Sequence, residues 1–396
     1  MTGASFAELT TLRLGGPIAR LVTATTQRDL VDLLHGVWGS GEPWLVLGGG
    51  SNLFAGDEGF DGTVVRIATN GIEVLPDAPE GSVRLRVQAG ENWDGFIAWT
   101  VAHGYSGLEA LSGIPGSVGA APVQNIGAYG QELSEALLGV WFLDEGADAP
   151  RWMPADELEL GYRTSVLKQG LAGVVVAVEV QLHDTAAERA VLGEAIGRPI
   201  AYAQLAAALG VQPGDRAPVA KVRETVLALR GSKGMVLDPD DPDSVSAGSF
   251  FTNPIVTEKV ARTLPADAPR WYLEPEQPDE VVPLSRLASH SPLDAFLELQ
   301  AELAAADEEP AADAAPAEPL VKLSAAWLIE QSGIRRGFAL PGSRAAVSSK
   351  HTLALTNRGG ATAAELAELA RYVRHRVQAE FGIVLHPEPV LVGVEI

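Results

Sequence analysis

The chain of 396 residues contains no cysteine, and its basic residues are few. The first absence excludes disulfides, thiolate metal sites and a cysteine nucleophile, and it is consistent with a reducing compartment. Against 29 Lys and Arg stand 51 Asp and Glu, which gives a formal net charge of −22. This excess of negative charge argues against nucleic acid or an anionic membrane as the main partner.

Long apolar runs are also missing, so we expect no membrane span. The first residues lack the basic and apolar regions of an export signal, and we therefore expect a cytoplasmic protein. Two nucleotide-binding motifs are absent as well, namely a Gly-x-Gly-x-x-Gly turn after a strand and a loop ending in Gly-Lys-Ser or Gly-Lys-Thr. Any flavin or nucleotide must therefore be held by a different fold.

The length exceeds what one hydrophobic core usually supports, so two or three domains are expected. The first half alternates predicted helices and strands. Helices are predicted over residues 26–38, capped by Thr26, and over residues 92–103, ended by Gly104. Predicted strands cover residues 44–47, 64–67, 83–89, 140–144 and 174–182.

The second half begins with predicted helices over residues 186–196 and 217–230, followed by a turn-rich acidic loop, residues 238–243. Residues 273–318 are rich in Asp, Glu, Ala and Pro, with Arg286 as the only Lys or Arg, and this composition predicts disorder. A last helix starts with the capping box of Thr362 and Glu365 and ends at Gly382. Its predicted buried stripe consists of Leu366, Leu369, Val373, Val377 and Phe381, and closing strands are predicted over residues 383–385 and 390–394.

The most informative segment is residues 113–130, which contains five glycines, two prolines and no charged residue. Glycine permits positive φ and a close approach to the backbone amides. The segment therefore suits a bed of N–H groups around an anionic or planar ligand. Residues 48–52, Gly-Gly-Gly-Ser-Asn, have the same character, although a tight turn explains them equally well. Together the two segments suggest a large nucleotide-type cofactor held from two sides.

Three other segments carry side chains able to do chemistry, and each also has a plainer interpretation. Ser249 precedes two phenylalanines, so it is either part of a turn over packed rings or a proton donor in a dry cleft. Arg163 is either an ordinary surface residue or a bidentate ligand for a carboxylate. Glu388, held between two prolines, is either a loop charge or a fixed general acid.

In this order along the chain, the motifs resemble those of the UDP-N-acetylenolpyruvoylglucosamine reductases, flavoenzymes of peptidoglycan precursor synthesis. The resemblance implies an α+β protein with a two-part FAD-binding fold of the vanillyl-alcohol-oxidase (PCMH) type and a separate α+β substrate-binding domain. The expected parts are FAD-binding subdomains at 1–70 and 71–230, a substrate-binding domain at 231–385, and a segment, 386–396, that returns to the active site. The matching segments are residues 11–16, 48–52, 113–130, 162–168, 248–254 and 325–331, together with Glu388.

The resemblance also implies roles for single residues. The implied catalytic residues are Arg163, Ser249 and Glu388. Non-covalent FAD would be held by Gly48, Gly49, Gly50, Ser51, Asn52, Gly113, Ile114, Pro115, Gly116, Ser117, Gly119, Ala120, Asn125 and Gly127. The UDP-sugar would be held by Tyr202, Lys233, Asn253 and Gln331, and Tyr202 resembles the subtype that closes a tyrosine loop over the substrate. No metal is required, and a monomer is expected.

The implied reaction reduces an enolpyruvyl ether to a lactyl ether with NADPH and FAD. Hydride would reach the vinyl methylene carbon, Arg163 and protonated Glu388 would stabilise the developing negative charge, and Ser249 would protonate the adjacent carbon. Two features depart from the family pattern, namely the 238–243 loop between Lys233 and Ser249 and the acidic insertion. Two alternatives stay open, an oxidase of alcohols or sugars on the same fold and a flavin- or nucleotide-sugar-binding protein without activity.

Overall fold

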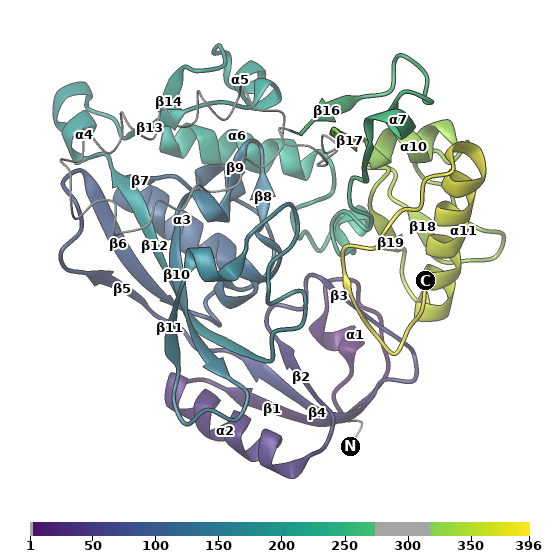
Figure 1. Cartoon of the computed structure of the whole chain (residues 1–396), viewed down its shortest axis with the longest axis horizontal. Helices are drawn as coiled ribbons and strands as arrows, with labels where there is room; N and C mark the ends of the chain where they lie inside the picture. Colours follow the sequence, from purple (N-terminus) through teal and green to yellow (C-terminus); the bar gives the residue numbers. More distant parts are fainter. Residues whose placement is uncertain (1–2, 274–317) are drawn as a thin grey trace, which may run out of the picture. The chain divides into compact units, whose positions relative to one another are not determined.

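The computed structural model describes residues 3–273 and 318–396. The prediction of disorder over residues 273–318 therefore falls almost entirely outside the described residues. The chain divides into two compact units, one made of Met1–Thr252 and Leu328–Ile396 and the other of Asn253–Trp327. Figure 1 follows the chain through its elements by colour.

The first unit begins with a short helix, α1 (Phe6–Leu9), and a parallel sheet in the order β1-β4-β2. Helix α2 packs against β1 and β4, which buries the apolar side chains at its helical spacing (Figure 1). The Thr26 hydroxyl caps α2, as the sequence predicts, and Gly41 ends the helix with a φ of 69°. The elements are β1 (Ile18–Ala24), α2 (Gln27–Ser40), β2 (Trp44–Leu47), β3 (Leu53–Ala55) and β4 (Phe60–Ile67).

A larger antiparallel sheet follows in the order β11-β10-β12-β6-β5, with β7 paired to β12. Helix α3 begins at Asn92 and ends at Gly104, and it buries Trp93, Phe96 and Ile97 in the core that this sheet supports. The elements are β5 (Ile72–Leu75), β6 (Ser82–Gln88), α3 (Trp93–His103), β7 (Tyr105–Ser106), β8 (Gly127–Ala128), β9 (Gln131–Glu132), β10 (Leu137–Asp144), β11 (Arg151–Pro154) and β12 (Gly173–Asp184).

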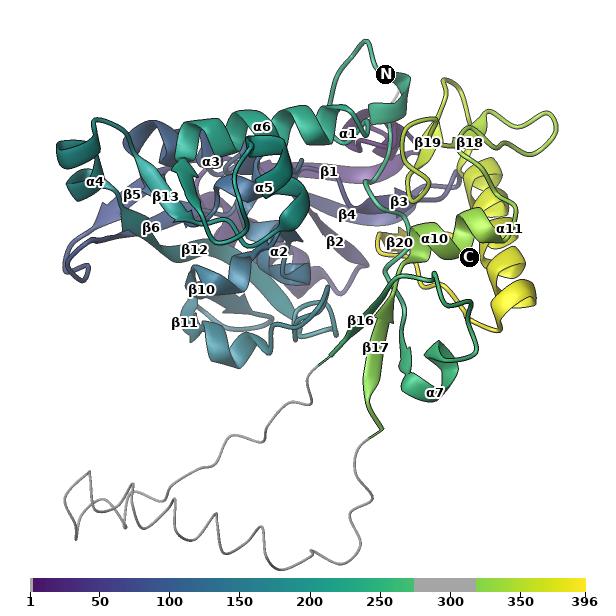
Figure 2. The same cartoon turned by 90° about the horizontal axis from the view of Figure 1, so that it is seen from above.

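The region after β12 differs from the predicted long helix over 186–196. Helix α4 ends early because Gly193 adopts a φ of 78°, and Ile196 then begins a strand that pairs with β14. Helix α6 packs against α3 and α5, and Figure 2 shows it running along one side of this part of the unit. The elements are α4 (Ala186–Leu192), β13 (Ile196–Pro199), α5 (Ala203–Leu209), β14 (Arg216–Pro218) and α6 (Val219–Gly231).

The C-terminal part of the first unit returns to its N-terminal part. The capping box at Thr362 and the end of α11 at Gly382 agree with prediction, but Phe381 is only partly buried. Residues 383–385 form no strand, whereas β20 pairs in parallel with β3 and thus places Glu388 beside Asn52. The elements are β18 (Ala345–Val347), β19 (Leu355–Asn357), α11 (Ala363–Phe381) and β20 (Val390–Val392), preceded by α10 (Ala325–Gln331), whose first three residues belong to the second unit.

The second unit is a small antiparallel sheet in the order β15-β17-β16, with α7 packed beside β15 and β17. The guanidinium group of Arg270 donates to five backbone carbonyls of residues 261–268, which closes the loop between α7 and β16. The elements are β15 (Ile255–Thr257), α7 (Glu258–Ala261), β16 (Arg270–Tyr272) and β17 (Leu320–Leu323).

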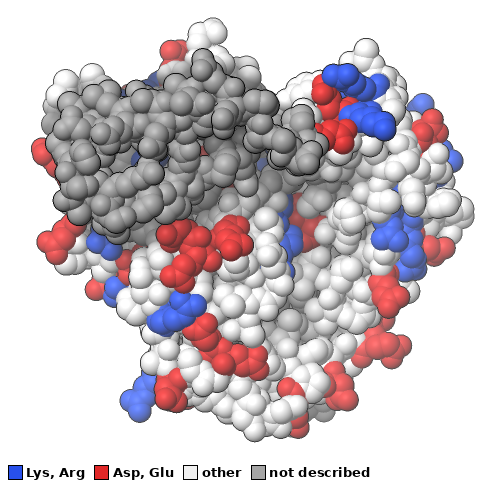
Figure 3. Space-filling model, in the orientation of Figure 1, with Lys and Arg blue, Asp and Glu red and all other residues white. Residues whose placement is uncertain are grey.

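The surface reflects the acidic composition of the chain. On the face drawn in Figure 3, acidic side chains occur in several groups, and Lys and Arg lie beside many of them. Within residues 3–273 and 318–396, no helix combines the length and hydrophobicity that a membrane span requires.

We predict that Asp57→Ala lowers the free energy of unfolding by about 1 kcal/mol, because it removes a capping carboxylate from the start of α11. Asp57 lies far from this helix in the sequence. The Asp57 carboxylate accepts the N–H groups of Ala363 and Ala364 at 2.8 and 2.9 Å, at the start of α11. Urea unfolding measures the change, with Glu58→Ala as the control because Glu58 is exposed and carries the same charge. Equal effects of the two substitutions would contradict the capping role.

Candidate active site

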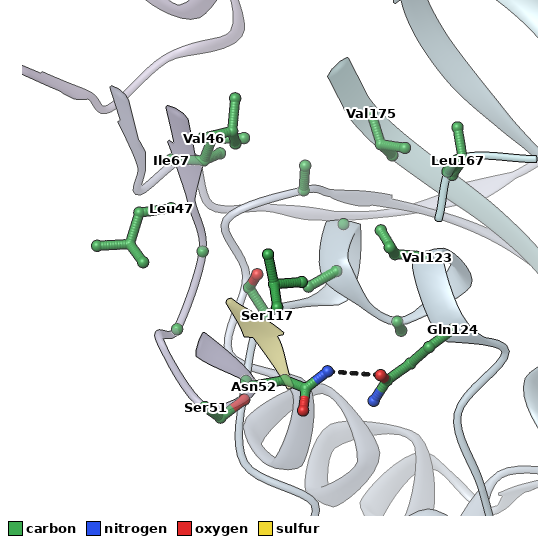
Figure 4. Close-up of a pocket in the computed structure, with 18 of the residues that line it drawn as sticks. Val46, Leu47, Ser51, Asn52, Ile67, Ser117, Val123, Gln124, Leu167 and Val175 are labelled. Atoms are coloured by element: carbon green, nitrogen blue, oxygen red, sulfur yellow. Dashed lines mark hydrogen bonds between the residues drawn. The ribbon is translucent and has the colours of Figure 1, made fainter. Parts of the chain in front are cut away.

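Two adjoining cavities lie in the first unit and share part of their walls. The first is enclosed by the two Gly-rich segments and by apolar residues of the surrounding sheets, and it leaves about 1270 Å³ free of protein atoms, including its open mouth. Figure 4 shows Ser51, Asn52 and Gln124 at its polar end, away from the apolar Val46, Ile67 and Val175. The shared wall consists of Ser51, Asn52, Ile114, Pro115, Gln124 and Ile126.

The first cavity exists because the two Gly-rich segments approach each other without side chains between them. A Cβ atom on Gly49 would lie 2.7 Å from the Cα of Gly116, which is closer than real Cβ contacts allow. The Ser51 hydroxyl donates to the Pro115 carbonyl at 2.7 Å, and Asn52 Nδ2 donates to Gln124 Oε1 at 2.5 Å (Figure 4). These contacts hold the segments together along one wall of the cavity.

The first Gly-rich segment offers free donors. Within the described part of the chain, the N–H groups of Gly49, Gly50 and Ser51 have no hydrogen-bond acceptor. Successive unpaired N–H groups on a cavity wall form a concave site for anionic groups such as phosphates. A long cavity with such donors and an apolar end fits a flavin dinucleotide, which has a diphosphate and a planar ring system.

Most residues predicted to contact the cofactor line the first cavity, namely residues 48–52 and Ile114, Pro115, Gly116, Ser117, Gly119 and Ala120. Three do not. Gly127 lines the second cavity instead. The N–H group of Gly113 donates to Asp94, and buried Asn125, at a φ of 42°, uses its side chain to hold Glu132, Ser134 and the Gly161 carbonyl.

The second cavity brings together the three predicted catalytic residues, which are far apart in the sequence. Arg163, Ser249 and Glu388 all line it. Arg163 Nε lies 3.3 Å from Glu388 Oε1, and the Glu388 N–H group donates to the Phe250 carbonyl, next to Ser249, at 2.9 Å. Arg163 and Glu388 are largely buried, and the packed rings that the plainer interpretation of Ser249 expects are also present, since the ring centres of Phe250 and Phe251 lie 5.2 Å apart.

Arg163 is held in an unusual backbone conformation. Its φ of 57° lies in the left-handed region, which costs a residue with a side chain about 1 kcal/mol or more. Two of its side-chain nitrogens donate to the carbonyls of Asn125 and Gly127, at 3.4 and 2.9 Å. The guanidinium group is thus fixed at the cavity wall, with its Nε toward Glu388.

Glu388 is buried near two cationic side chains, Arg163 and Lys168. Burial raises the pKa of Glu388, and the positive charges of Arg163 and Lys168 offset part of this rise. Burial also lowers the pKa of Lys168, which lines the first cavity. A carboxyl group that holds its proton can donate a hydrogen bond to a charge that develops in the cavity.

The far side of the second cavity is cationic and aromatic. Lys233 Nζ lies 5.5 Å from the ring centre of Tyr129, and that ring packs edge-on against Tyr202 at 5.9 Å. Arg230, which we did not predict, also lines this cavity, and its buried Nε has no partner among the described residues. Burial and the charge of Arg230 lower the pKa of Lys233. The only available signal for Arg230 was its spacing of three residues from Lys233 at the end of a helix.

His351 is a second residue of this cavity that the sequence analysis missed. Burial, together with the nearby charges of Lys233 and Arg336, lowers the pKa of His351 to about 4, so its imidazole is neutral at pH 7. No motif surrounds His351 in the sequence, and only the folded chain brings it to the site.

Two predicted substrate residues lie elsewhere. Gln331 is exposed at the end of α10 and lines neither cavity. Asn253 belongs to the second unit, where its side-chain oxygen accepts the Ala325 N–H group at 3.0 Å. Their roles stay predictions.

Comparison with known proteins identifies relatives along almost the whole chain. Residues 18–147 match the sequence model described as "FAD binding domain", and residues 240–392 match "UDP-N-acetylenolpyruvoylglucosamine reductase, C-terminal domain". The UDP-N-acetylenolpyruvoylglucosamine reductase of Leifsonia xyli subsp. xyli is 58% identical over 390 residues, which cover 98% of each chain. That of Saccharopolyspora erythraea is 48% identical over 98% of this chain and 95% of the relative.

A solved structure extends the agreement to the fold. The crystal structure of the UDP-N-acetylenolpyruvylglucosamine reductase (MurB) from Thermus caldophilus aligns with a TM-score of 0.58 and 24% identity, over 98% of this chain and 97% of that one. The predicted α+β fold with an FAD-binding domain is thereby confirmed. The chain therefore belongs to the UDP-N-acetylenolpyruvoylglucosamine reductase family and carries an FAD-binding domain.

Proposed function

We propose that the protein reduces UDP-N-acetylenolpyruvoylglucosamine to UDP-N-acetylmuramate, with NADPH as the electron donor and FAD as the bound cofactor. The observation that carries this proposal is the convergence of Arg163, Ser249 and Glu388 in one cavity that shares a wall with a Gly-lined cavity. An anion binder needs cationic groups, but it needs neither a buried carboxyl group nor a serine beside it.

FAD would lie in the first cavity, held by the N–H groups of Gly49, Gly50 and Ser51, with residues 114–117, 119 and 120 along the facing wall. When bound, it supplies the hydride that the reaction requires. Gly113 and Asn125 would act indirectly, since they fix the segments that line the cavities. In this proposal residues 1–70 and 71–230 form the two halves of the cofactor site, residues 231–385 bind the substrate, and residues 386–396 bring Glu388 to it.

The UDP-sugar would lie in the second cavity, where Lys233 and Arg230 offer positive charge to its diphosphate. We also propose that Tyr202 belongs to a tyrosine loop that covers the substrate, because its ring is 44% exposed at the cavity rim.

In this proposal Arg163 and Glu388 stabilise negative charge, and Ser249 donates a proton. As hydride reaches the vinyl carbon of the substrate, negative charge spreads onto the substrate carboxylate, where Arg163 and protonated Glu388 stabilise it. The Ser249 hydroxyl then gives its proton to the adjacent carbon. Serine is a weak acid, but a carbanion is basic enough to take its proton.

The alternative function for a flavin site of this kind is oxidation of alcohols or sugars. It would give no role to the Arg163, Ser249 and Glu388 set, and it would consume oxygen. An anaerobic titration with NADPH and then with UDP-N-acetylenolpyruvoylglucosamine separates the two, because only the reductase is bleached by the first reagent and reoxidised by the second. Bleaching without reoxidation by that substrate would refute the proposal.

We predict that Ser249→Ala lowers kcat by about 10²–10⁴-fold, the usual contribution of a general acid. Reduction of the bound flavin by NADPH is expected at the wild-type rate, because that step does not use the serine proton. Stopped-flow absorbance resolves the two half-reactions. Ser40→Ala, at the exposed end of α2, is the matched control, and normal turnover in Ser249→Ala would remove Ser249 from the mechanism.

We predict that kcat falls as the pH rises through the pKa of Glu388, because the protonated form is the active one. The sign follows from burial, which raises this pKa above its ordinary value of 4.5, so the active form persists further toward neutral pH. Glu388→Gln keeps an uncharged donor that does not titrate. Its pH profile should lose this alkaline decline while kcat is reduced, and an unchanged decline would assign it to another group.

We predict that Gly49→Ala raises the Kd for FAD at least about tenfold, because the added Cβ would push the Gly116 backbone away from it. Titration of the flavin-free protein with FAD, followed by fluorescence quenching, gives the Kd. Gly36→Ala is the control, since a Cβ at that helical position meets no atom within 4 Å. Equal Kd values for both variants would contradict the proposed cradle.

A further inference from the structure

We propose that Asp243 is a positioning residue of the active site, and that Asp241 assists it. The two aspartates, here called the acidic clamp, hold the 348–354 turn, and this turn holds the backbone that carries Ser249 and Glu388. This inference rests on the proposed reductase activity. It gives a role to the 238–243 loop, which the sequence analysis identified only as a departure from the family pattern.

The clamp grips the turn at two adjacent residues. Asp243 Oδ1 accepts the Ser349 N–H group at 2.8 Å, and Asp243 Oδ2 accepts the Ser349 hydroxyl at 2.5 Å. Lys350 Nζ donates to Asp241 Oδ2 at 2.8 Å. Three bonds to charged groups thus join two segments that are more than 100 residues apart in the sequence.

Asp243 is the stronger of the two contacts. Only 6% of its surface is exposed, and a buried carboxylate is tolerated only where hydrogen bonds replace water. Burial acts to raise its pKa, but the hydrogen bonds from Ser349 and Ser348 and the positive charge of Arg358 together outweigh burial, and the net pKa is lowered. The carboxylate therefore stays charged and bound at neutral pH. The Lys350 side chain is 38% exposed, so its ion pair contributes less.

Hydrogen bonds within the 348–354 turn connect the residues held by the clamp to the rest of the turn. The Ser348 hydroxyl accepts the N–H groups of Lys350 and His351 at 3.1 and 3.2 Å. The Ser348 N–H group donates to the Ala354 carbonyl at 2.8 Å, and the Ala354 N–H group donates to the His351 carbonyl at 3.1 Å. His351, whose side chain lines the second cavity, is fixed by the same bonds.

From the turn, two backbone hydrogen bonds lead to the catalytic residues. The Phe250 N–H group donates to the Leu353 carbonyl at 2.7 Å, and the Phe250 carbonyl accepts the Glu388 N–H group at 2.9 Å. Phe250 is adjacent to Ser249 and fully buried. A shift of the turn therefore moves the proton donor and the buried acid together, and small misplacements of reacting groups reduce rates strongly.

The segment before Ser249 has a second anchor, so loss of the clamp is expected to displace the site without unfolding it. The Asn357 N–H group donates to the Val245 carbonyl at 3.1 Å, and the Ser246 carbonyl accepts the Thr11 hydroxyl at 2.6 Å. Neither bond involves the acidic clamp.

The test compares Asp243→Ala with Asp240→Ala, which removes the same charge from an exposed position of the same loop. We expect Asp243→Ala to lower kcat about tenfold, with KM for both substrates within about twofold, unchanged flavin content and a folded protein. Amide hydrogen exchange should accelerate at Phe250 and Glu388 in this variant and stay at the wild-type rate in Asp240→Ala. A folded Asp243→Ala protein with wild-type kcat and wild-type exchange would overturn the proposal.

Two further measurements cover the other outcomes. Ser349→Ala removes one of the two bonds to Asp243, so its loss of kcat should be smaller, and Asp243→Ala should lose no more when Ser349→Ala is added. If Asp243→Ala fails to fold, Ser349→Ala decides the question. Wild-type kcat and wild-type amide exchange in Ser349→Ala would then overturn the proposed positioning role of Asp243. If the wild-type protein shows no substrate-dependent NADPH oxidation, the proposed function fails, while the exchange comparison still decides whether the clamp holds the 249–250 and 388 backbone.

Discussion

The close approach of two backbone segments at Gly49 and Gly116 is the constraint on which the rest of the site depends. With no side chain between them, the segments form a wall that both cavities use. One face of this wall presents free N–H groups, and the other borders the residues with acid–base chemistry. A ligand in the first cavity is therefore brought against a ligand in the second without any further structure. This proximity is what a transfer reaction between two bound molecules requires.

The candidate site is mainly cationic, whereas the whole chain is strongly acidic. The net charge is −22, yet Arg163, Lys168, Arg230 and Lys233 line the two cavities, with Glu388 as their acidic partner. Burial makes each of these charges count for more than a charge on the surface. An anionic substrate thus meets a local field that attracts it inside a protein whose surface repels it. Selectivity for the site over the remaining surface follows from this contrast.

Local patterns in the sequence predicted most helices and strands, and capping residues predicted their ends. Thr26, Gly104 and Thr362 act as expected because each of these caps lies next to its helix in the sequence. The errors have equally local causes: Gly193 ends α4 before Ile196, and residues 383–385 lack a partner strand although their composition is apolar. The three proposed catalytic residues could be named only through the family resemblance, since each alone had a plainer interpretation. Arg230, His351 and Asp243 were missed as site residues because their significance comes from contacts across the fold.

The pairing of β20 with β3 has a consequence for how the protein becomes active. Asn52 and Glu388 touch although 336 residues separate them, and the Val390 N–H group closes the same junction on the Asn52 carbonyl. Contacts between such distant positions form late, because the intervening chain must be ordered first. The segment that leaves the ribosome last therefore completes both cavities, because Val390 lines the first and Glu388 lines the second. A polypeptide clipped before Glu388 would lack both residues, so neither cavity would have its complete wall.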